Sequence, residues 1–307
     1  MKNLALFAII VIACISRCAD AANIALITRD DIAPYREFAR QFEDAVRRYG
    51  NPDHSLRVFS LSRDDSDLTQ LSEKVRQSSS AVLVCVGAGA ADFCREHFSG
   101  TPRISCMIPS HRDLIRSVQA GALGISMDPD PALKFEALRA LLPNAKTVGA
   151  VYDPAESGEL IHAAAAAGRM HGMTLTAMQV SEAKDAPASV EKIMGQVDAF
   201  LLFYDRTILT PQTLEVLLNA SFFRNVPVIG FSEKYAALGA PLSFEVPIAD
   251  LAREAWNAAE ICFGCRETCR DLRTVKNPGR LIVNKKVVEK MGLNIPERIL
   301  DKGSIIE

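Results

Sequence analysis

The sequence predicts an α/β protein made of two doubly wound, parallel-sheet lobes joined by a multi-strand hinge. Three observations lead to this prediction. Short apolar strand patterns alternate with amphipathic helices, which is typical of a parallel sheet covered on both faces. The alternation repeats after about 120 residues, which is the size of one domain. The chain continues after the second repeat with more strand and helix segments than a single lobe can accommodate.

In the first half, short strands and helices alternate regularly. Strands are expected at 23–28, 56–61, 81–86 and 103–108, and helices at 33–49, 65–77 and 90–98. The helix at 33–49 carries apolar residues at helical spacing and ends before Gly50. This half therefore has the pattern of one complete lobe.

The second half repeats the same order of elements. Strands are expected at 147–153, 173–180, 198–205 and 226–231, and helices at 158–172, 188–197 and 210–225. Strand 147–153 corresponds to 23–28, strand 198–205 to 81–86, and strand 226–231 to 103–108. The repeat is one of architecture more than of residue identity, and it predicts a second, similar lobe.

The chain is expected to pass between the lobes more than once. A short strand and the prolines in 121–131 form a first crossing, and 238–246, 248–264 and 279–300 come after the second lobe's last strand. The predicted domains are lobe 1 at 22–126 plus 247–272, and lobe 2 at 127–246 plus 273–307. Several crossings make a hinge that opens and closes a cleft, so strand-end turns of both lobes are expected to converge there.

The N-terminus reads as an export signal, predicted at 1–21. Lys2 precedes the apolar run LALFAIIVIACI, and Ala19-Asp20-Ala21 offers the small-x-small pattern of a cleavage site. Two alternatives stay open: a retained membrane anchor, and a lipobox that ends at Cys14 and makes this residue a candidate for lipidation. Every route places residues from about 22 onward in a periplasmic or other extracytoplasmic location, with or without a lipid anchor.

Eight cysteines are present, two of them in or beside the export signal. Cys262, Cys265 and Cys269 are closely spaced, but no histidine lies nearby to complete a tetrahedral metal site. A local disulfide or simple thiols are the favoured interpretation, and no metal is predicted. Cys85 and Cys106 lie in apolar strand patterns, where small buried thiols are ordinary.

The stretch AVLVCVGAGAADF at 81–93 brings a strand into Gly87-Ala88-Gly89. A dinucleotide site requires a third glycine or alanine where Asp92 stands, a place after the first strand, and an acid after the next strand. None of these conditions is met, so no cofactor is predicted. Glycines without Cβ atoms instead let a small ligand approach the backbone, although a tight turn of small residues explains them equally well.

Ligands of open parallel sheets bind at the carboxyl ends of the strands, and the turns found there supply the candidate ligand-binding residues. These side chains and backbone donors suit a small zwitterionic or polar ligand with an apolar part. The candidates are Thr28, Arg29, Asp30, Gly87, Ala88, Gly89, Ala90, Tyr152, Tyr204, Asp205, Arg206, Ser232 and Glu233.

Three segments carry a resemblance to a known family: EALRALLPNAKTVGAVYDPAE at 136–156, ALGAPLSFEVPIADLARE at 237–254 and GRLIVNKKVVEKMGLNIPERIL at 279–300. In these the chain resembles ABC-transporter substrate-binding proteins of the tryptophan/tyrosine-transport type, within the two-lobed type I periplasmic-binding-protein superfamily. The resemblance implies solute capture outside the cytoplasm and delivery to a permease with an ATPase subunit. It implies ligand-side turns at 28–30, 87–90, 205–206 and 232–233. Family members usually carry Thr or Ser with Pro where this chain has residues 87–90, so the resemblance does not identify the ligand.

A solute-binding protein is therefore the predicted function. The sequence has no GxSxG elbow, Walker loop or HExxH motif, so no enzyme activity and no catalytic residue is predicted. The formal net charge is −2 and no basic cluster is present, so no nucleic-acid partner is expected. The expected partners are a small molecule and an ABC permease, with membrane contact only through the permease or a lipid anchor. A ligand-sensing module for a membrane receptor or kinase is the alternative, because fold does not determine function.

Overall fold

The computed structural model describes residues 22–61, 68–128, 130–264, 272–274, 279–296 and 304–306. The predicted export signal, Cys14, Cys265 and Cys269 lie outside these residues. The chain divides into two compact units. Unit 1 holds the described residues of 22–108, Asp113–Ile125 and Ile248–Arg273, and unit 2 holds Pro109–Arg112, Ser126–Pro247 and the described residues of 274–307. The chain therefore crosses between the units after Ile125, after Pro247 and after Arg273, besides the short segment Pro109–Arg112.

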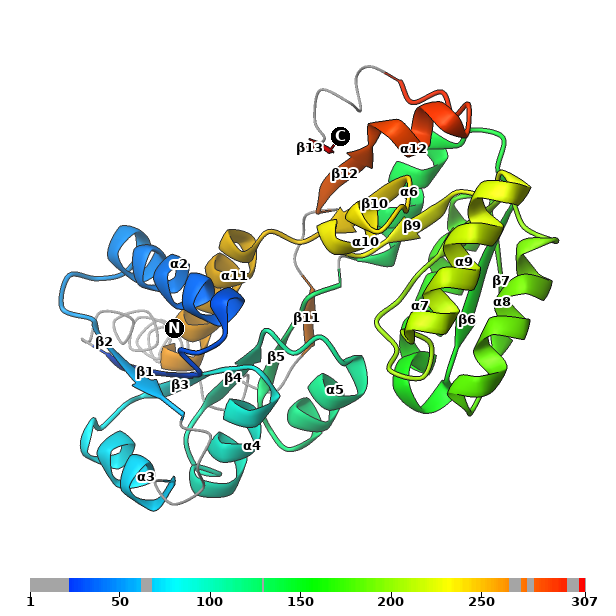
Figure 1. Cartoon of the computed structure of the whole chain (residues 1–307). Helices are drawn as coiled ribbons and strands as arrows, with labels where there is room; N and C mark the ends of the chain where they lie inside the picture. Colours follow the sequence, from blue (N-terminus) through cyan, green and yellow to red (C-terminus); the bar gives the residue numbers. More distant parts are fainter. Residues whose placement is uncertain are drawn as a thin grey trace, which may run out of the picture. The chain divides into compact units, whose positions relative to one another are not determined.

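Unit 1 is built on a six-stranded sheet with the order β11-β5-β4-β3-β1-β2 (Figure 1). Its strands are β1 (Asn23–Thr28), β2 (Ser55–Ser60), β3 (Val82–Val86), β4 (Arg103–Cys106), β5 (Leu123–Ser126) and β11 (Leu272–Thr274). Its helices are α2 (Ala33–Tyr49), α3 (Leu68–Gln77), α4 (Ala88–His97), α5 (His111–Gln119) and α11 (Ile248–Gly264). From β2 to β5, neighbouring strands pair in parallel.

Unit 2 is built on a seven-stranded sheet with the order β13-β12-β10-β9-β8-β6-β7. Its strands are β6 (Thr147–Tyr152), β7 (Thr174–Gln179), β8 (Ala199–Leu201), β9 (Val228–Gly230), β10 (Leu242–Glu245), β12 (Arg280–Asn284) and β13 (Ser304–Ile306). Its helices are α6 (Pro131–Leu141), α7 (Pro154–Met170), α8 (Ala186–Met194), α9 (Pro211–Arg224), α10 (Glu233–Ala237) and α12 (Lys285–Lys290), with a 3₁₀ turn η2 (Ala183–Asp185). Strands β7 to β10 pair in parallel, whereas β12 runs antiparallel to β10.

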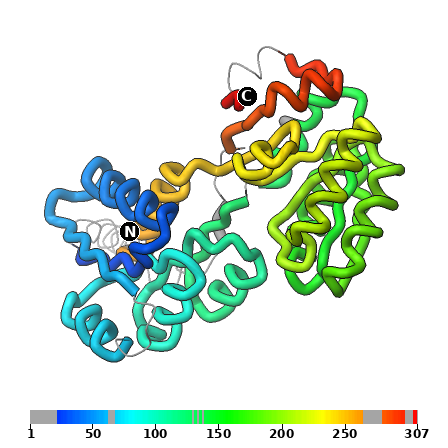
Figure 2. Tube along the Cα trace, viewed as in Figure 1, coloured from blue at the N-terminus to red at the C-terminus, as the bar shows by residue number. Residues whose placement is uncertain are grey.

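Helices cover both faces of the sheet in unit 1. Successive residues of β1 point to opposite faces, so Ala25 and Ile27 pack with α3 and α4 while the fully buried Ile24 and Leu26 face the other side. That other side is covered by α2 and α11, which pack against each other although they lie far apart in the sequence (Figure 2). The C-terminal part of the chain thus completes the core of unit 1.

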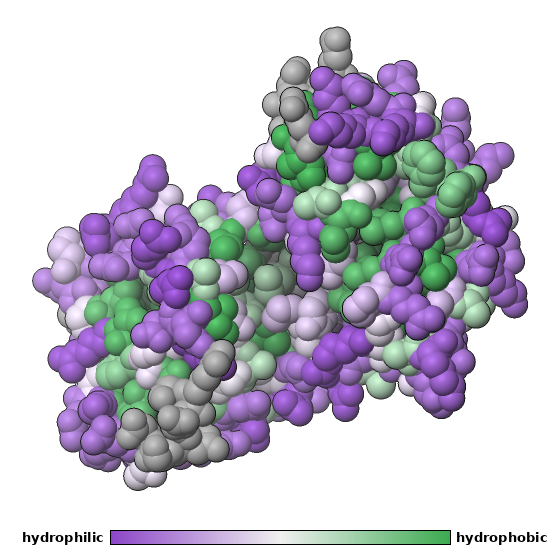
Figure 3. Space-filling view, in the orientation of Figure 1, coloured by the Kyte–Doolittle hydropathy of each residue, from purple (hydrophilic) through white to green (hydrophobic). Residues whose placement is uncertain are grey.

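Unit 2 has the same two-sided construction. One hydrophobic cluster joins α6, α7 and α12 to the sheet, and Phe135 is its largest fully buried residue. A second cluster joins α8 and α9 to the sheet around Phe200. Hydrophilic residues cover most of the visible surface of each unit, and the apolar residues seen between them form small groups (Figure 3). Both units therefore bury a core on each face of their sheet.

The predicted fold class is confirmed, including the repeat. The order β2-β1-β3-β4-β5 in unit 1 returns as β7-β6-β8-β9-β10 in unit 2. Some details differ from the sequence prediction: helix α5 was not anticipated, and β8 is limited to Ala199–Leu201 instead of 198–205. The N–H of Leu202 still donates to the carbonyl oxygen of Ile229, and further along the chain the buried carboxylate of Asp205 accepts the N–H groups of Thr207 and Ile208.

One arginine in each unit, buried in unit 1 and partly exposed in unit 2, joins the ends of two helices. In unit 1, Arg103 is 4% exposed and donates to the carbonyl oxygens of Cys94 and Phe98 at the end of α4, and of Ala120 after α5. In unit 2, Arg139 does the same between α6 and α7, with the carbonyl oxygens of Pro143, Ala145, His171 and Gly172. A cation satisfies the orphan carbonyls of helix C-termini and is favoured there by the helix dipole.

Replacing Arg103 by Met should lower the free energy of unfolding of unit 1 by about 2–4 kcal/mol, because buried carbonyl oxygens lose a charged donor. Trp256, the single tryptophan, lies in this unit, so its fluorescence during urea unfolding measures the change. The matched control is Arg95→Met on the exposed surface of α4, which should cost at most about 0.5 kcal/mol. Equal midpoints for the two variants would contradict this account of Arg103.

Candidate functional site

The strand order of each sheet identifies a switch point at the carboxyl end of one central strand. Strands β2 and β3 lie on opposite sides of β1, and β7 and β8 lie on opposite sides of β6, so the connections diverge at the carboxyl ends of β1 and β6. Such switch points are where open α/β sheets bind ligands. Thr28 ends β1 and Gly87 follows β3, and because Ile27 pairs with Cys85, Thr28 lies level with Val86 beside this loop.

Thr28 carries an unpaired polar group at the switch point of unit 1. The residue is 3% exposed, and its hydroxyl has no hydrogen-bond partner in the described part of the chain. Its backbone is satisfied by the sheet and by Leu61, whose N–H donates to the Thr28 carbonyl at 2.7 Å. A buried hydroxyl without a partner is unusual, so Thr28 stays a candidate ligand contact.

The N-terminus of α4 lies next to Thr28 and is not capped by a side chain. Gly87 is the N-cap with φ of 87°, and its own N–H donates to Cys106. The N–H groups of Ala88, Gly89 and Ala90 are in the first turn, where a helix provides no internal acceptor. A Cβ added at Gly89 would meet only Leu61, at 3.7 Å, so the backbone here is open to a ligand.

Gly87 has a second reason to be glycine. A Cβ at this position would lie 2.5 Å from the hydroxyl oxygen of Tyr35, which comes from the first turn of α2. The positive φ also disfavours any L side chain. Tyr35 therefore borders the loop of unit 1. The sequence analysis predicted a helix at 33–49 but did not name Tyr35 as a candidate, because helical spacing does not reveal which loop a residue reaches.

Arg29 and Asp30 lie in the turn after β1, where the side chain of Arg29 and the backbone carbonyl of Asp30 have neighbours as partners. The Arg29 guanidinium donates two hydrogen bonds to Asp31, and this pairing raises the pKa of Arg29. The exposed Asp30 offers its carbonyl oxygen to Arg36. The structure thus groups Thr28 with the Gly87–Ala90 loop and leaves Arg29 and Asp30 on the outer side of the turn.

Asp205 has a supporting role at the switch point of unit 2. It is 1% exposed, and its carboxylate accepts hydrogen bonds from the backbone of Asp153, Thr207 and Ile208 and from the hydroxyl of Ser157. Burial raises the pKa of Asp205, against these four hydrogen bonds, which act in the opposite direction. The carboxylate of Asp205, a predicted candidate, thus joins the loop after β8 to the turn between β6 and α7.

Glu156 organises the cations of unit 2. It lies in the first turn of α7 at 9% exposure and accepts two hydrogen bonds from Arg206, at 2.8 and 3.0 Å, and one from Arg112 at 3.0 Å. The bond from Arg206 is the main cause of the lowered pKa of Glu156; burial opposes it, and Arg112 adds to it. Arg206, a predicted candidate, is thereby held in one orientation by a residue that the sequence analysis missed.

Three aromatic rings gather after β8 and β9. The ring of Tyr204 contacts Phe231 edge-on with centroids 6.1 Å apart, and Phe231 contacts Tyr235 at 4.5 Å. Burial raises the pKa of Tyr235 to about 12. Tyr204 was predicted, whereas Phe231 and Tyr235 were not. Tyr152 belongs to the core instead: it is 5% exposed and its hydroxyl accepts from Gln179 of the neighbouring strand.

Ser232 and Glu233 open the short helix α10. Ser232 is the N-cap residue but makes no side-chain capping bond. Glu233 is exposed and accepts a hydrogen bond from Arg280 at 3.1 Å, and the same guanidinium donates to Glu245. Glu233 is thus linked through Arg280 of β12 to Glu245 of β10, and Ser232 follows Phe231 of the aromatic group directly in the chain.

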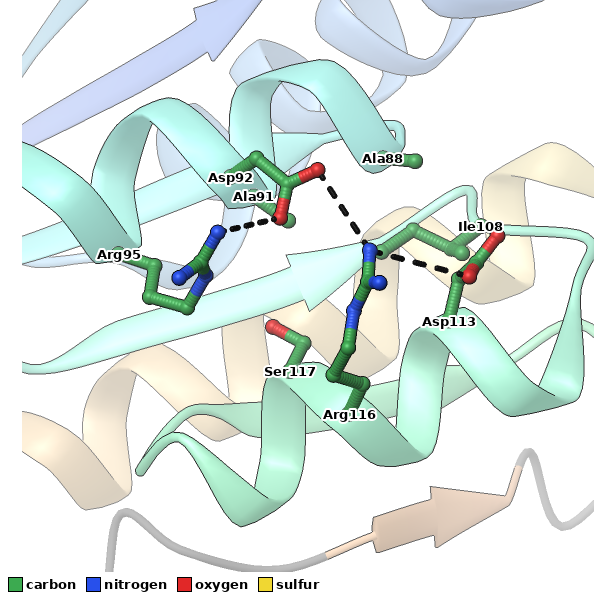
Figure 4. A pocket seen from close by; sticks show the side chains of 8 residues that line it. All are labelled: Ala88, Ala91, Asp92, Arg95, Ile108, Asp113, Arg116 and Ser117. Atoms are coloured by element: carbon green, nitrogen blue, oxygen red, sulfur yellow. Dashed lines mark hydrogen bonds and ion pairs between the residues drawn. The ribbon is translucent and has the colours of Figure 1, made fainter.

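A small groove of unit 1 lies between α4 and α5 (Figure 4). Its floor is apolar, and the charged side chains around it pair with one another, Arg95 with Asp92 and Arg116 with Asp92 and Asp113. The enclosed volume is about 10 Å³, which is about the space of one water molecule. This groove is too small for an amino-acid-like ligand.

Metal and thiol chemistry have no visible place in the described residues. Within these ranges, no three His, Cys, Asp or Glu side chains are grouped to hold a metal ion. Cys85, Cys94 and Cys106 are fully buried free thiols, and burial raises the pKa of Cys94 and of Cys106. Among the described helices, none combines the length and the apolar character that a membrane span requires.

A family profile described as ABC transporter substrate binding protein matches residues 41–305. The chain belongs to this family. Its members bind solutes and are typically neither enzymatic nor cytoplasmic. The resemblance stated from the sequence is thereby confirmed at the family level. A search of the curated proteins found no match.

Several solved structures share the fold of this substrate-binding protein. The ligand-free, open structure of CD0873, a substrate-binding protein with adhesive properties from Clostridium difficile, is 14% identical with a TM-score of 0.71, covering 94% of this chain and 99% of its own. A conserved domain protein from Vibrio cholerae is 18% identical, TM-score 0.60, covering 94% and 100%. An ABC domain in complex with L-Trp from Streptococcus pneumoniae is 19% identical, TM-score 0.59, with the same coverage.

The Glu156 cluster predicts a defined pH dependence of stability. Since the pKa of Glu156 is lower in the folded chain than its ordinary value of 4.5, its carboxylate stabilises unit 2 above that pH. The stabilisation is lost as pH falls through the folded-state pKa. We expect Glu156→Gln to be less stable than the parent at pH 7 and to lose less stability between about pH 5 and 3.

Thermal unfolding followed by circular dichroism at several pH values measures this difference. Glu215→Gln, at an exposed position of α9, makes the same charge change and is the matched control. Parallel curves of melting temperature against pH for the parent and Glu156→Gln would show that the arginine pairs contribute nothing to folding.

Proposed function

We propose that this protein is the extracytoplasmic binding component of an ABC importer. It captures a small polar or amino-acid-like ligand and delivers it to a membrane permease with an ATPase subunit. Membership of the substrate-binding family supports this role. The sequence of 1–21 supports export, either by cleavage to a soluble periplasmic form or with a lipid anchor at Cys14.

The observation that carries the proposal is the unpaired hydroxyl of Thr28 beside the uncapped N-terminus of α4. The hydroxyl of Thr28 and the N–H groups of Ala88, Gly89 and Ala90 can donate hydrogen bonds to an acceptor on a ligand. A helix N-terminus also favours negative charge. A carboxylate satisfies both requirements, so we assign the carboxylate of the ligand to this loop of unit 1.

Unit 2 offers a separate candidate contact surface, for an apolar group. Tyr204 and Phe231 are partly exposed and contact each other edge-on, so they offer an apolar surface, whereas Tyr235 belongs to the buried core of unit 2. No catalytic step is required.

Ligand binding should raise the melting temperature. A ligand at a hundredfold excess over Kd stabilises the folded state by about 2.7 kcal/mol. Differential scanning fluorimetry with amino acids, organic acids and purines, including L-Trp because the Streptococcus structure contains it, measures the shift. Mass spectrometry of protein purified from its natural host identifies a retained ligand. The proposal would be refuted if no compound raised the melting temperature and no retained ligand were found. If cells that lack this chain no longer took up the ligand, the importer role would be established.

Thr28→Val should weaken ligand binding about tenfold while leaving the free protein equally stable or more stable, since the change removes a hydroxyl that has no partner in the free chain. Calorimetric titration and unfolding measure the two effects. Ser243→Ala is the matched control, because Ser243 carries another buried, unpaired hydroxyl, on β10. It should leave affinity unchanged. Unaltered affinity in Thr28→Val would remove Thr28 from the site.

A further inference from the structure

Lys134 is a buried lysine near the N-terminus of α6. The residue is 5% exposed, and its Nζ donates to the carboxylate of Asp128 at 3.1 Å. A lysine is almost never buried without a partner, and the helix dipole disfavours a cation at the N-terminal end of a helix. The helix itself therefore gives no reason for an ammonium group at this position, and the reason must lie in what the group contacts.

Asp128 lies in the first crossing between the units. Ile125 is the last residue of unit 1 at this crossing, and Ser126, which ends β5, is the first residue of unit 2. The N–H of Asp128 donates to the hydroxyl of the buried Ser126 at 3.0 Å, so the chain turns immediately after the strand. The ammonium group of Lys134 binds the carboxylate of this turn. It thus holds the crossing segment to α6 close to the boundary of unit 2.

The same ammonium group contacts the loop after β8. The Nζ of Lys134 lies 5.4 Å from the centroid of the Phe203 ring, within the range of a cation–π interaction. Phe203 is 4% exposed and directly precedes the candidate residues Tyr204 and Asp205. One buried group therefore contacts two segments of unit 2 that lie far apart in the sequence.

These contacts restrict geometry more than they add stability. A buried ion pair is weak evidence of stability, because its attraction is offset by the cost of removing both charges from water. Its position is nevertheless defined, since the Nζ must stay near both the carboxylate and the ring. Bending of the crossing at Asp128 would withdraw the carboxylate, and a shift of Phe203 would withdraw the ring.

We propose that Lys134 is a positioning residue that couples the first crossing to the loop carrying Tyr204. Bending at this crossing is confined to bonds before Asp128, and the loop moves together with the crossing segment. The importance of Tyr204 for binding rests on the proposed function. The coupling itself is a property of the free chain, so its failure would leave the proposed solute binding untouched.

Hydrogen exchange followed by mass spectrometry tests the coupling on the full chain, with no ligand added. Phe203→Leu removes the ring but keeps an apolar side chain, and it should accelerate exchange about tenfold at 126–128, because coupling between two segments is reciprocal. In a Lys134→Met background, the same change at Phe203 should have no further effect at 126–128, since the ammonium group that transmits it is absent. This dependence on Lys134 distinguishes transmission from a general loosening of unit 2.

Two matched variants serve as controls. Phe200→Leu makes the same change in the hydrophobic cluster on the other face of the sheet, and Lys184→Met removes an exposed lysine that pairs with Glu182. Neither should alter exchange at 126–128. Equal exchange there in the parent and in Phe203→Leu would overturn the proposal, as would an effect of Phe203→Leu that Lys134→Met does not diminish. Loss of folding in both single variants would also overturn it, since a residue that only positions two segments is not required for the fold.

Discussion

The parallel pairing of one central strand with neighbours on both sides is the constraint on which the rest of each unit depends. Strand β1 pairs with β2 and β3, and β6 pairs with β7 and β8, so the chain must leave these strands in opposite directions. This divergence leaves backbone donors and strand-end side chains at one edge without a helix over them. The buried position of Thr28 beside the Gly87 loop follows from the register of β1 and β3.

The two units share this framework but differ in how the helices at the carboxyl ends of their strands are capped. In unit 2, the helices after the central strands are capped from within, since Asp153 caps α7 and Thr210 caps α9. In unit 1, the helix after β3 has glycine as its N-cap and no capping side chain. The repeat of the fold therefore does not repeat the chemistry. Unit 1 has an uncapped helix N-terminus at α4, whereas unit 2 has neighbouring aromatic rings and an arginine held by Glu156.

Much of this organisation could be predicted from the sequence because it rests on periodicity. Alternating strand and helix patterns predicted the two sheets and their repeat, and the strand ends predicted Thr28 and the 87–90 loop as candidates. The hydrogen-bond partners of individual side chains could not be predicted from the sequence. Asp205 was expected to meet the ligand, but it is surrounded by four donors of its own unit. Glu156, Tyr35, Phe231 and Tyr235 were missed because their importance arises from contacts with residues distant in the sequence or around a turn.

The sequence by itself determined which segments are strands and helices, how often the pattern repeats and which turns follow the strands, since hydrophobic spacing and glycine or proline signals are local properties. Only the tertiary structure decided which polar groups in those turns are already satisfied. That Arg29 is paired with Asp31, that Arg206 is held by Glu156 and that the hydroxyl of Thr28 has no partner in the described chain depend on strand order and register. The physical reason is that hydrogen bonding is a pairwise property of groups in space, whereas a sequence specifies each group singly.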